Sequence, residues 1–332
     1  MTDREVVTVC VDAMGGDDAP EAILAGIPAA LASDARLRVV LTGPEDVIRP
    51  FAASHPGTVD AVVTSQVIAM DEHPAQAVRS KKDSSLVVGC RLVREGKADA
   101  FFSAGSTGAA MAAATLIMGR IPGVGRPAIA TVLPTAGPPL VMLDAGANAD
   151  CKPENLLQFA HMGSAYAHEV LGVASPRVAL LNIGSEETKG SQLALESYAL
   201  MSAAVPGFIG NLEANHVLDG VVDVLVTDGF TGNVVLKLLE GTSRTLLTQV
   251  RGAMTATPLT TLAAGIIRPH LAEMKDRLDP EAYGGAPLLG VNGVCIIGHG
   301  SSGPRAVREA LGVASRAVRG RLTDSIAERI RA

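Results

Sequence analysis

The sequence predicts an α/β fold with a Rossmann-like sheet in three layers. Short β-branched runs alternate with longer helical patterns along the 332 residues, as in βαβ units with a mainly parallel sheet. The runs end in polar turns that contain glycine, which is typical of the carboxyl ends of strands in such sheets. Hydrophobic residues make up 48% of the chain, enough for the substantial core that this fold requires.

The elements follow from hydrophobic periodicity. Strands are expected where aliphatic residues, many of them β-branched, run together between turn residues, and helices where apolar residues recur at helical spacing. The expected strands are Val6–Val11, Leu37–Leu41, Val59–Val63, Ala100–Phe102, Ala128–Val132, Leu140–Leu143, Val178–Leu181, Val222–Val226 and Val294–Ile297. The expected helices are about Pro20–Ala32, Ser84–Glu95, Thr107–Met118, Pro153–Leu171, Ser191–Ala204, Gly232–Val250 and Pro304–Ile330.

Six of these strands are followed by turns in which Asp, Asn, Ser, Thr, Lys or His accompanies glycine. The carboxyl ends of parallel strands share one edge of an open sheet, and ligands bind in the crevice there. The sequence therefore predicts that six polar turns converge on one site. The turns are Asp12–Asp17, Ser103–Gly105, Asp144–Asn148, Asn182–Gly190, Thr227–Asn233 and Gly298–Gly303.

The chain departs from this alternation between Gly252 and Leu278. Its apolar residues keep roughly helical spacing, interrupted by Pro258 and Pro269, which predicts a helical excursion from the sheet at about 252–280. No low-complexity linker or internal repeat marks a boundary, so residues 1–332 are expected to form a single domain. The apolar residues are Leu259, Leu262, Ala263, Ile266, Ile267, Leu271, Met274 and Leu278.

Composition and charge exclude several classes of protein. The net charge of −6 argues against a nucleic-acid binder, because no overall basic field is present. The four cysteines form no C-x-x-C pair and are expected to be free thiols of a reducing cytoplasm. No signal peptide or membrane-spanning stretch is recognisable, which predicts a cytoplasmic protein. The cysteines are Cys10, Cys90, Cys151 and Cys295.

The segment Ser103–Gly108 joins a predicted strand to a predicted helix. Glycine lets the backbone approach a ligand, the first-turn N–H groups lack partners, and the helix dipole favours an anion there. The hydroxyls of Ser103, Ser106 and Thr107 add donors, so the segment is a candidate phosphate site. The alternative is that Ser106 or Thr107 only caps the helix and the glycines only turn the chain.

Standard cofactor signatures are absent from the sequence. There is no P-loop, no H-E-x-x-H and no G-x-S-x-G, and Gly123-Val124-Gly125 is followed by Pro127 and a strand rather than by a helix. We therefore expect no cofactor and no metal. Without an activated Ser or Cys, a covalent intermediate is not expected either.

Lys189 is the cation best placed for chemistry on an anion. It lies in the turn Glu186–Gly190, after a predicted strand, where it could neutralise phosphate or stabilise an oxyanion. It could equally be a surface lysine paired with Glu186 or Glu187. Asn233 lies at the start of a predicted helix and could be an N-cap alone.

Taken together, the motifs resemble one family. Seven occur in order: VCVDAMGGD (Val9–Asp17), SKKDSS (Ser80–Ser85), SAGSTGA (Ser103–Ala109), LDAGAN (Leu143–Asn148), NIGSEETKG (Asn182–Gly190), TDGFTGN (Thr227–Asn233) and YGGAPLLG (Tyr283–Gly290). From about Val9 to Ser302 the chain resembles the acyl-carrier-protein:phosphate acyltransferases of bacterial phospholipid synthesis, the PlsX family. Asp18 stands where this family usually has Asn, and Ser185 replaces a usual Thr.

The resemblance implies an architecture and a reaction. The fold would be that of isocitrate and isopropylmalate dehydrogenases, and a long-chain acyl group would pass from acyl carrier protein to inorganic phosphate by direct attack on the thioester. The catalytic residues would be Lys189 and Asn233. The residues expected to bind phosphate or substrate are Asp12, Gly15, Gly16, Ser103, Gly105, Ser106, Thr107, Gly108, Asp144, Asn148, Asn182, Thr188, Gly229, Thr231 and His299.

The resemblance also implies partners. Acyl carrier protein is acidic and needs a basic docking patch on this acidic chain. The candidates, which could equally be a solvated helix face, are Arg79, Lys81, Lys82, Arg91 and Arg94, with Lys97 beside them. The helical excursion is expected to contribute to a homodimer and to touch the inner face of the membrane, near the downstream glycerol-3-phosphate acyltransferase.

Three alternatives remain at this point. One is a phosphotransacylase that uses short acyl-CoA. Another is a nicotinamide dehydrogenase on a related sheet, although the dinucleotide fingerprint and the aspartate cluster of such metal-dependent enzymes are missing. The last is a non-catalytic scaffold for lipid-synthesis enzymes.

Overall fold

The computed structural model describes residues 6–262, 264–267 and 283–331. Its centre is one 11-stranded sheet with the order β3-β2-β1-β4-β11-β10-β5-β6-β9-β7-β8. The strands are β1 (Val7–Asp12), β2 (Leu37–Gly43), β3 (Val59–Val63), β4 (Ala100–Ser103), β5 (Ala128–Leu133), β6 (Leu140–Leu143), β7 (Val178–Asn182), β8 (Phe208–Glu213), β9 (Val224–Val226), β10 (Ala286–Leu289) and β11 (Val294–Ile297).

The sheet is mainly parallel, as expected, but three antiparallel pairings interrupt it near its centre. Strands β1 to β4 and β11 run parallel, but β10 is antiparallel to both β11 and β5, and β5 is antiparallel to β6. These three reversals leave β6, β9, β7 and β8 parallel to one another and opposite to the first group. The expectation that six turns share one edge of a parallel sheet is therefore wrong in that form.

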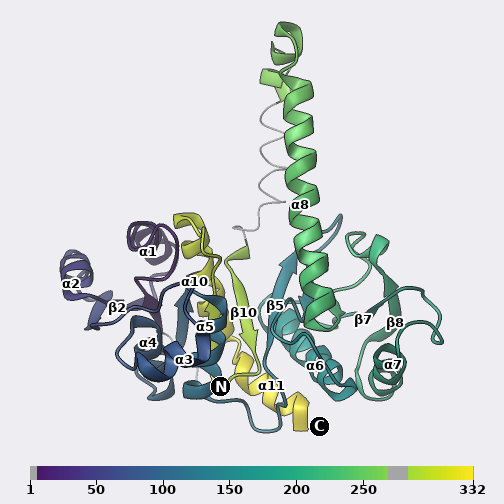
Figure 1. The fold of residues 1–332 in the computed structure, drawn as a ribbon, viewed down its shortest axis with the longest axis horizontal. Helices are drawn as coiled ribbons and strands as arrows, with labels where there is room; N and C mark the ends of the chain where they lie inside the picture. Colours follow the sequence, from purple (N-terminus) through teal and green to yellow (C-terminus); the bar gives the residue numbers. More distant parts are fainter. Residues whose placement is uncertain (1–5, 263, 268–282, 332) are drawn as a thin grey trace.

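Helices cover both faces of the sheet (Figure 1). Because side chains alternate along a strand, Val9 and Val11 face one core cluster, which includes α1, α6 and α10, while Cys10 faces the other, which includes α4 and α5. The helices are α1 (Glu21–Ser33), α2 (Glu45–Ser54), α3 (Pro74–Ser80), α4 (Ser85–Arg94), α5 (Thr107–Ala113), the π-helical turn η1 (Ala114–Met118), α6 (Pro153–Glu169), α7 (Gln192–Ala204), the 3-10 turn η2 (Ala214–His216), α8 (Gly229–Met254), α10 (Pro304–Arg319) and α11 (Leu322–Arg331).

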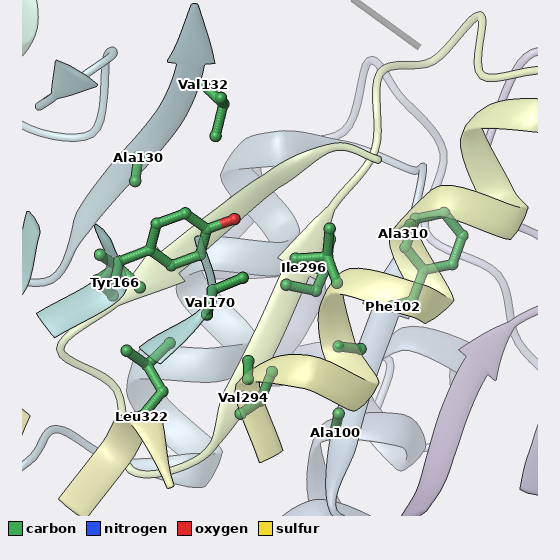
Figure 2. Close-up of a cluster of buried hydrophobic side chains, with 14 of the residues drawn as sticks. Ala100, Phe102, Ala130, Val132, Tyr166, Val170, Val294, Ile296, Ala310 and Leu322 are labelled. Carbon is green, nitrogen blue, oxygen red and sulfur yellow. The ribbon is translucent and has the colours of Figure 1, made fainter. Parts of the chain in front are cut away.

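The first of these clusters joins the two halves of the sheet. Figure 2 shows Tyr166 from α6 and Leu322 from α11 on the same side of the sheet as Val294 and Ile296 of β11. Tyr166 is 1% exposed, so the central antiparallel strands are as fully covered as the parallel ones. This packing gives the loops on both halves a rigid base.

Most expected elements are present, and the missed ones have physical reasons. All nine expected strands form, but β8 and β10 were not expected, because β8 mixes polar residues with apolar ones and β10 contains Pro287, which lacks an N–H group. Helices α2 and α3 were not expected either, because Pro50 lies inside α2 and α3 is short. The expected Pro304–Ile330 helix breaks at Arg321, whose φ is 54°.

Helix α8 is the least covered element of the structure. It rises out of the body of the protein, and among its 26 residues only Gly229 and Gly232 are buried (Figure 1). Beyond it, residues 258–262 and 264–267 are helical, in agreement with the first part of the expected excursion. The expectations for Ala263, Pro269, Leu271, Met274 and Leu278 lie outside the described residues. No helix in the described ranges is long and apolar enough to span a bilayer.

Candidate functional site

The turns after β1 and β4 are joined by a buried hydrogen-bond network. Asp12, only 3% exposed, accepts a hydrogen bond at Oδ2 from Ser103 Oγ (2.8 Å) and at Oδ1 from the N–H of Met14 (3.1 Å). Ser103 Oγ in turn accepts from the N–H of Gly105 (3.1 Å). Burial raises the pKa of Asp12, and hydrogen bonds from Ser85 and Ser103 offset part of that rise. Asp12 and Ser103 thus hold the two turns in place.

Two glycines let these turns touch. A Cβ at Gly15 would lie 2.7 Å from both the Gly105 nitrogen and Ser103 Oγ, and Gly16 has a φ of +126° that few other residues adopt. The N–H of Asp17 donates to the carbonyl of Gly300 (2.7 Å), which brings in the turn after β11.

The turn after β11 carries His299. His299 is exposed, and its Nδ1 lies 2.8 Å from Ser301 Oγ. The contact between Asp17 and Gly300 places this turn beside the turn after β1. The turns after β1, β4 and β11 therefore form one group, as expected for parallel neighbouring strands.

The start of α5 has features of both interpretations of the segment Ser103–Gly108, the phosphate site and the helix cap. Ser106 Oγ accepts from the N–H of Ala109 (3.4 Å), so Ser106 is a helix cap, and the N–H of Gly105 is used by Ser103. Gly108 is a packing residue, because a Cβ there would lie 2.7 Å from Pro74 of α3. Thr107 is exposed, and its hydroxyl and first-turn N–H remain as donors for an anion.

A second group of turns is organised by Asp144, which is fully buried. Its Oδ1 accepts from the N–H groups of Ile129 (3.1 Å), Gly146 (3.1 Å) and Ala147 (2.9 Å). Its Oδ2 accepts from Asn148, through the backbone N–H (2.7 Å) and through Nδ2 (2.8 Å). The carboxylate is saturated by these donors. Asp144 and Asn148 therefore shape the turn.

This turn supports the start of α8. The N–H of Gly229 donates to the carbonyl of Asn148 (2.8 Å). Asp228 caps the helix, accepting at its two oxygens from the N–H and the hydroxyl of Thr231, each at 2.8 Å. The hydroxyl of Thr231 is thus committed to the cap. The expected helix start at Gly232 is corrected to Gly229.

Asn233 lies within the first turns of α8 and is not its N-cap. Its side chain is exposed and faces the turn after β6, since a Cβ on Gly146 would lie 3.6 Å from Asn233 Oδ1. The alternative that Asn233 only caps the helix is excluded by Asp228. The amide of Asn233 is available to a ligand beside the Asp144 turn.

Lys189 stands in the turn after β7. Its backbone is fixed, because its N–H donates to the carbonyl of Glu186 (3.2 Å) and its carbonyl accepts from Asn182 Nδ2 (3.0 Å). Its side chain is exposed, as is that of Thr188. Within the part of the chain that the structure describes, Lys189 forms no ion pair with Glu186 or Glu187, and Glu187 accepts from the hydroxyl of Tyr198 (3.0 Å) instead.

Cys151 is a neighbour of this second group that sequence reasoning did not assign to a site. Its Sγ donates to the carbonyl of Asn148 (3.5 Å). Burial raises the pKa of its thiol to about 11, with a smaller opposing contribution from the N–H of Gly229. The thiol is therefore protonated at neutral pH and is a poor nucleophile.

The candidate docking residues lie on or close to α3 and α4, and several of them have partners. Lys81 is committed to Glu72 (2.6 Å) and to the carbonyl of Val67 (2.8 Å), and Arg91 donates to the carbonyl of Lys82 (2.8 Å). Lys97 pairs with Glu95 (2.8 Å). The exposed candidates are Arg79, Lys82, Arg94 and Lys97, and of these Arg79, Lys82 and Arg94 form no ion pair within the described residues.

The six predicted turns therefore form separate groups. The turns after β1, β4 and β11 hold one another, and the turns after β6 and β9 hold one another. The turn with Lys189 is braced by Asn211 of β8, whose Nδ2 donates to the carbonyl of Glu186 (2.9 Å). The candidate catalytic residues, Lys189 and Asn233, belong to the half of the sheet that contains β6, β9 and β7.

Comparisons with known proteins identify the family. The model of the fatty acid synthesis protein family matches residues 7–324. A phosphate acyltransferase of Heliobacterium modesticaldum is 51% identical over 97% of both chains, and one of Bacillus licheniformis is 44% identical over 97% of this chain and 98% of its own.

Solved structures show the same fold at low identity. A phosphotransacetylase from Streptococcus pyogenes superposes with a TM-score of 0.61 at 16% identity, covering 99% of this chain and 96% of its own. The EutD phosphotransacetylase from Staphylococcus aureus gives 0.60 at 17% identity, with 95% of each chain covered. The fold is shared with these proteins, and the sequence places the chain more narrowly: it belongs to the fatty acid synthesis protein family, the PlsX family that its seven motifs predict.

Proposed function

We propose that this protein is an acyltransferase that moves a long-chain acyl group from the thioester of acyl carrier protein to inorganic phosphate, for phospholipid synthesis. The observation that carries the proposal is Lys189, exposed and without an ion-pair partner in the described part of a chain that is about half identical to phosphate acyltransferases. A free ammonium beside a fixed backbone turn suits an anionic nucleophile and a developing oxyanion.

The reaction needs no general base, because phosphate is already an anion. One phosphate oxygen attacks the thioester carbonyl, the new C–O bond forms, and the C–S bond breaks as the tetrahedral intermediate collapses. The proton of the hydrogen phosphate ion goes to the departing sulfur, which gives acyl phosphate and the free thiol. Lys189 and the amide of Asn233 stabilise the negative oxygen of the intermediate, and the Asp144 turn holds Asn233 in position.

A second part of the proposal concerns phosphate. In the first group of turns, Thr107 is exposed and offers its hydroxyl and its first-turn N–H as donors, and the exposed His299 lies in the adjacent turn. The N–H end of a helix favours an anion. This supports a role for the α5 start in receiving phosphate or the phosphate of the donor's prosthetic arm.

The exposed cations Arg79, Lys82 and Arg94 support docking of an acidic carrier protein. Apolar side chains on the excursion, such as Leu259, Leu262 and Ile266, are exposed and support a homodimer whose helix tips touch the inner face of the membrane. Such a location would pass acyl phosphate to a glycerol-3-phosphate acyltransferase. We also infer that the sheet is related to that of isocitrate and isopropylmalate dehydrogenases. We infer further that residues 1–332 form a single domain.

One assay tests the function. Purified protein is given acyl-loaded acyl carrier protein with and without inorganic phosphate, and the free thiol and acyl phosphate are measured. The proposal expects thiol release that depends on phosphate, with one acyl phosphate for each thiol. Equal or better turnover with short acyl-CoA would instead indicate a phosphotransacylase, and absence of turnover with every donor would indicate a scaffold.

A further inference from the structure

Helix α8 carries two separate apolar faces. Val235, Leu236 and Leu239 are half-buried and pack against the core of the sheet. On another side, Phe230, Val234 and Leu238 are 66%, 51% and 67% exposed. Their spacing of four residues places them in one row along the helix. The helix therefore uses one apolar face for folding and leaves the other open.

The open row begins at the candidate catalytic residues. Phe230 lies three residues before Asn233, so the two are neighbours on the helix surface. Asn182, which fixes the backbone of Lys189, is followed directly by Ile183, whose side chain is 81% exposed. Large apolar side chains thus stand in water next to both Lys189 and Asn233. Exposed apolar side chains gathered beside candidate catalytic residues favour a binding surface for an apolar ligand.

The substrate supplies an occupant for this surface. If the thioester carbonyl lies at Lys189 and Asn233, the hydrocarbon chain extends away from these residues. Contact of the chain with an apolar protein surface is then more favourable than its exposure to water. The row spans eight residues of helix, about 12 Å at 1.5 Å per residue, and runs away from the sheet. None of its three residues is charged, and Lys237 beside the row pairs with Glu240 (2.8 Å).

We propose that Phe230, Val234 and Leu238, with Ile183 at their base, form an acyl track that binds the hydrocarbon chain of the substrate and selects for its length. The inference rests on the proposed function and adds the residues that recognise the chain. Contact with the row is hydrophobic and non-directional, so the track favours long chains without requiring one chain length.

The test uses Leu238→Gln, which lies five residues beyond Asn233, about 7.5 Å along the helix axis, and is not placed at the reacting atoms. The measurement is kcat/KM with palmitoyl- and butyryl-loaded acyl carrier protein. The ratio of the two values is expected to fall about tenfold, the equivalent of about two methylene groups returned to water. Leu116→Gln is the control, since Leu116 is 52% exposed but lies on η1 rather than on α8, and it should leave the ratio unchanged.

Two outcomes would overturn the acyl track. One is an unchanged ratio in Leu238→Gln. The other is a change in oligomeric mass by light scattering in that variant, which would assign the row to contact between copies of the chain. If the proposed function itself is wrong, the result differs from these two outcomes: the unaltered protein gives no acyl phosphate with either donor.

Discussion

Asp144 Oδ2 accepts two hydrogen bonds from Asn148, one from its backbone N–H at 2.7 Å and one from its side-chain Nδ2 at 2.8 Å. The carbonyl of the same Asn148 accepts from the N–H of Gly229 (2.8 Å), where α8 begins. A chain of contacts therefore runs from a fully buried carboxylate to the helix that carries Asn233. Two residues predicted to bind substrate thus also support the helix that carries a predicted catalytic residue.

Replacing Asp144 with Asn should destabilise the fold. The amide keeps one accepting oxygen and turns an NH₂ group toward N–H donors, and each buried donor left unpaired costs about 1–3 kcal/mol. We expect the free energy of unfolding to fall by about 2–4 kcal/mol in urea titrations. Asp150→Asn, at an exposed position on the same loop, is the control. A loss of less than about 1 kcal/mol would contradict the structural role of Asp144.

Replacing Lys189 with Ala should affect catalysis and not folding. The side chain is exposed, so its removal leaves no cavity and the unfolding midpoint should hold. Loss of the charge on the oxyanion should lower kcat by about 10²–10³-fold in the thiol-release assay. Ser185→Ala, in the same turn, should retain activity. A normal kcat in Lys189→Ala would show that Lys189 takes no part in catalysis.

Cys151 should be dispensable for acyl transfer. Its thiol pKa is raised to about 11 by burial, so little thiolate exists at neutral pH. We expect Cys151→Ala to keep kcat within about twofold, and iodoacetamide labelling of this thiol in the folded protein to rise as the pH approaches 11. An acyl group trapped on Cys151 and detected by mass spectrometry would argue for a covalent intermediate.

The exposed cations should act through association with the carrier protein. Charge reversal at Arg79, Lys82 and Arg94 together should raise KM for the acyl carrier protein about tenfold or more at low salt, with little change in kcat. The increase should shrink at high ionic strength, where screening already weakens the attraction. Arg49→Glu on α2, also exposed, is the control. A salt-independent effect would point to misfolding instead.

The pair Asp223–Arg177 should govern part of the acid sensitivity. Asp223 is 5% exposed and accepts from Arg177 through the backbone N–H (2.8 Å), Nε (3.0 Å) and an Nη (2.9 Å). The hydrogen bond from the Arg177 side chain is the largest cause that lowers the pKa of Asp223 below its ordinary value. The stabilisation is therefore complete above the ordinary value and is lost as pH falls through the lowered one.

The corresponding measurement is the pH dependence of unfolding below pH 5. Asp223→Asn should be less stable at neutral pH and should lose less stability on acidification than the unaltered protein. Asp219→Asn, at an exposed position nearby, should leave the slope unchanged. If the free energy of unfolding falls with pH in parallel for Asp223→Asn and the unaltered protein, Asp223 does not contribute to the acid sensitivity.

The fold and much of the site were predictable because their signals are local. Apolar runs mark β1, β4 and β11, and the polar residues that follow them do lie in turns. Asp228 could have been recognised as a cap, since it stands three residues before Thr231 at a helix start. Ile183 and Phe230 carry no sequence signal of exposure, because an apolar residue beside a strand or in a helix is ordinarily buried.

By itself, the sequence determined the α/β class, the order of most elements and the family, because periodicity and motifs are properties of neighbouring residues. Only the tertiary structure decided how these parts meet. The antiparallel strands β10 and β5 turn one half of the sheet against the other, so the six turns gather in separate groups. Long-range contacts also decided which polar groups are already satisfied, as Asp144 and Lys81 are, and which remain free, as Lys189 does. Hydrogen-bond satisfaction depends on partners distant in the chain, and no local pattern encodes it.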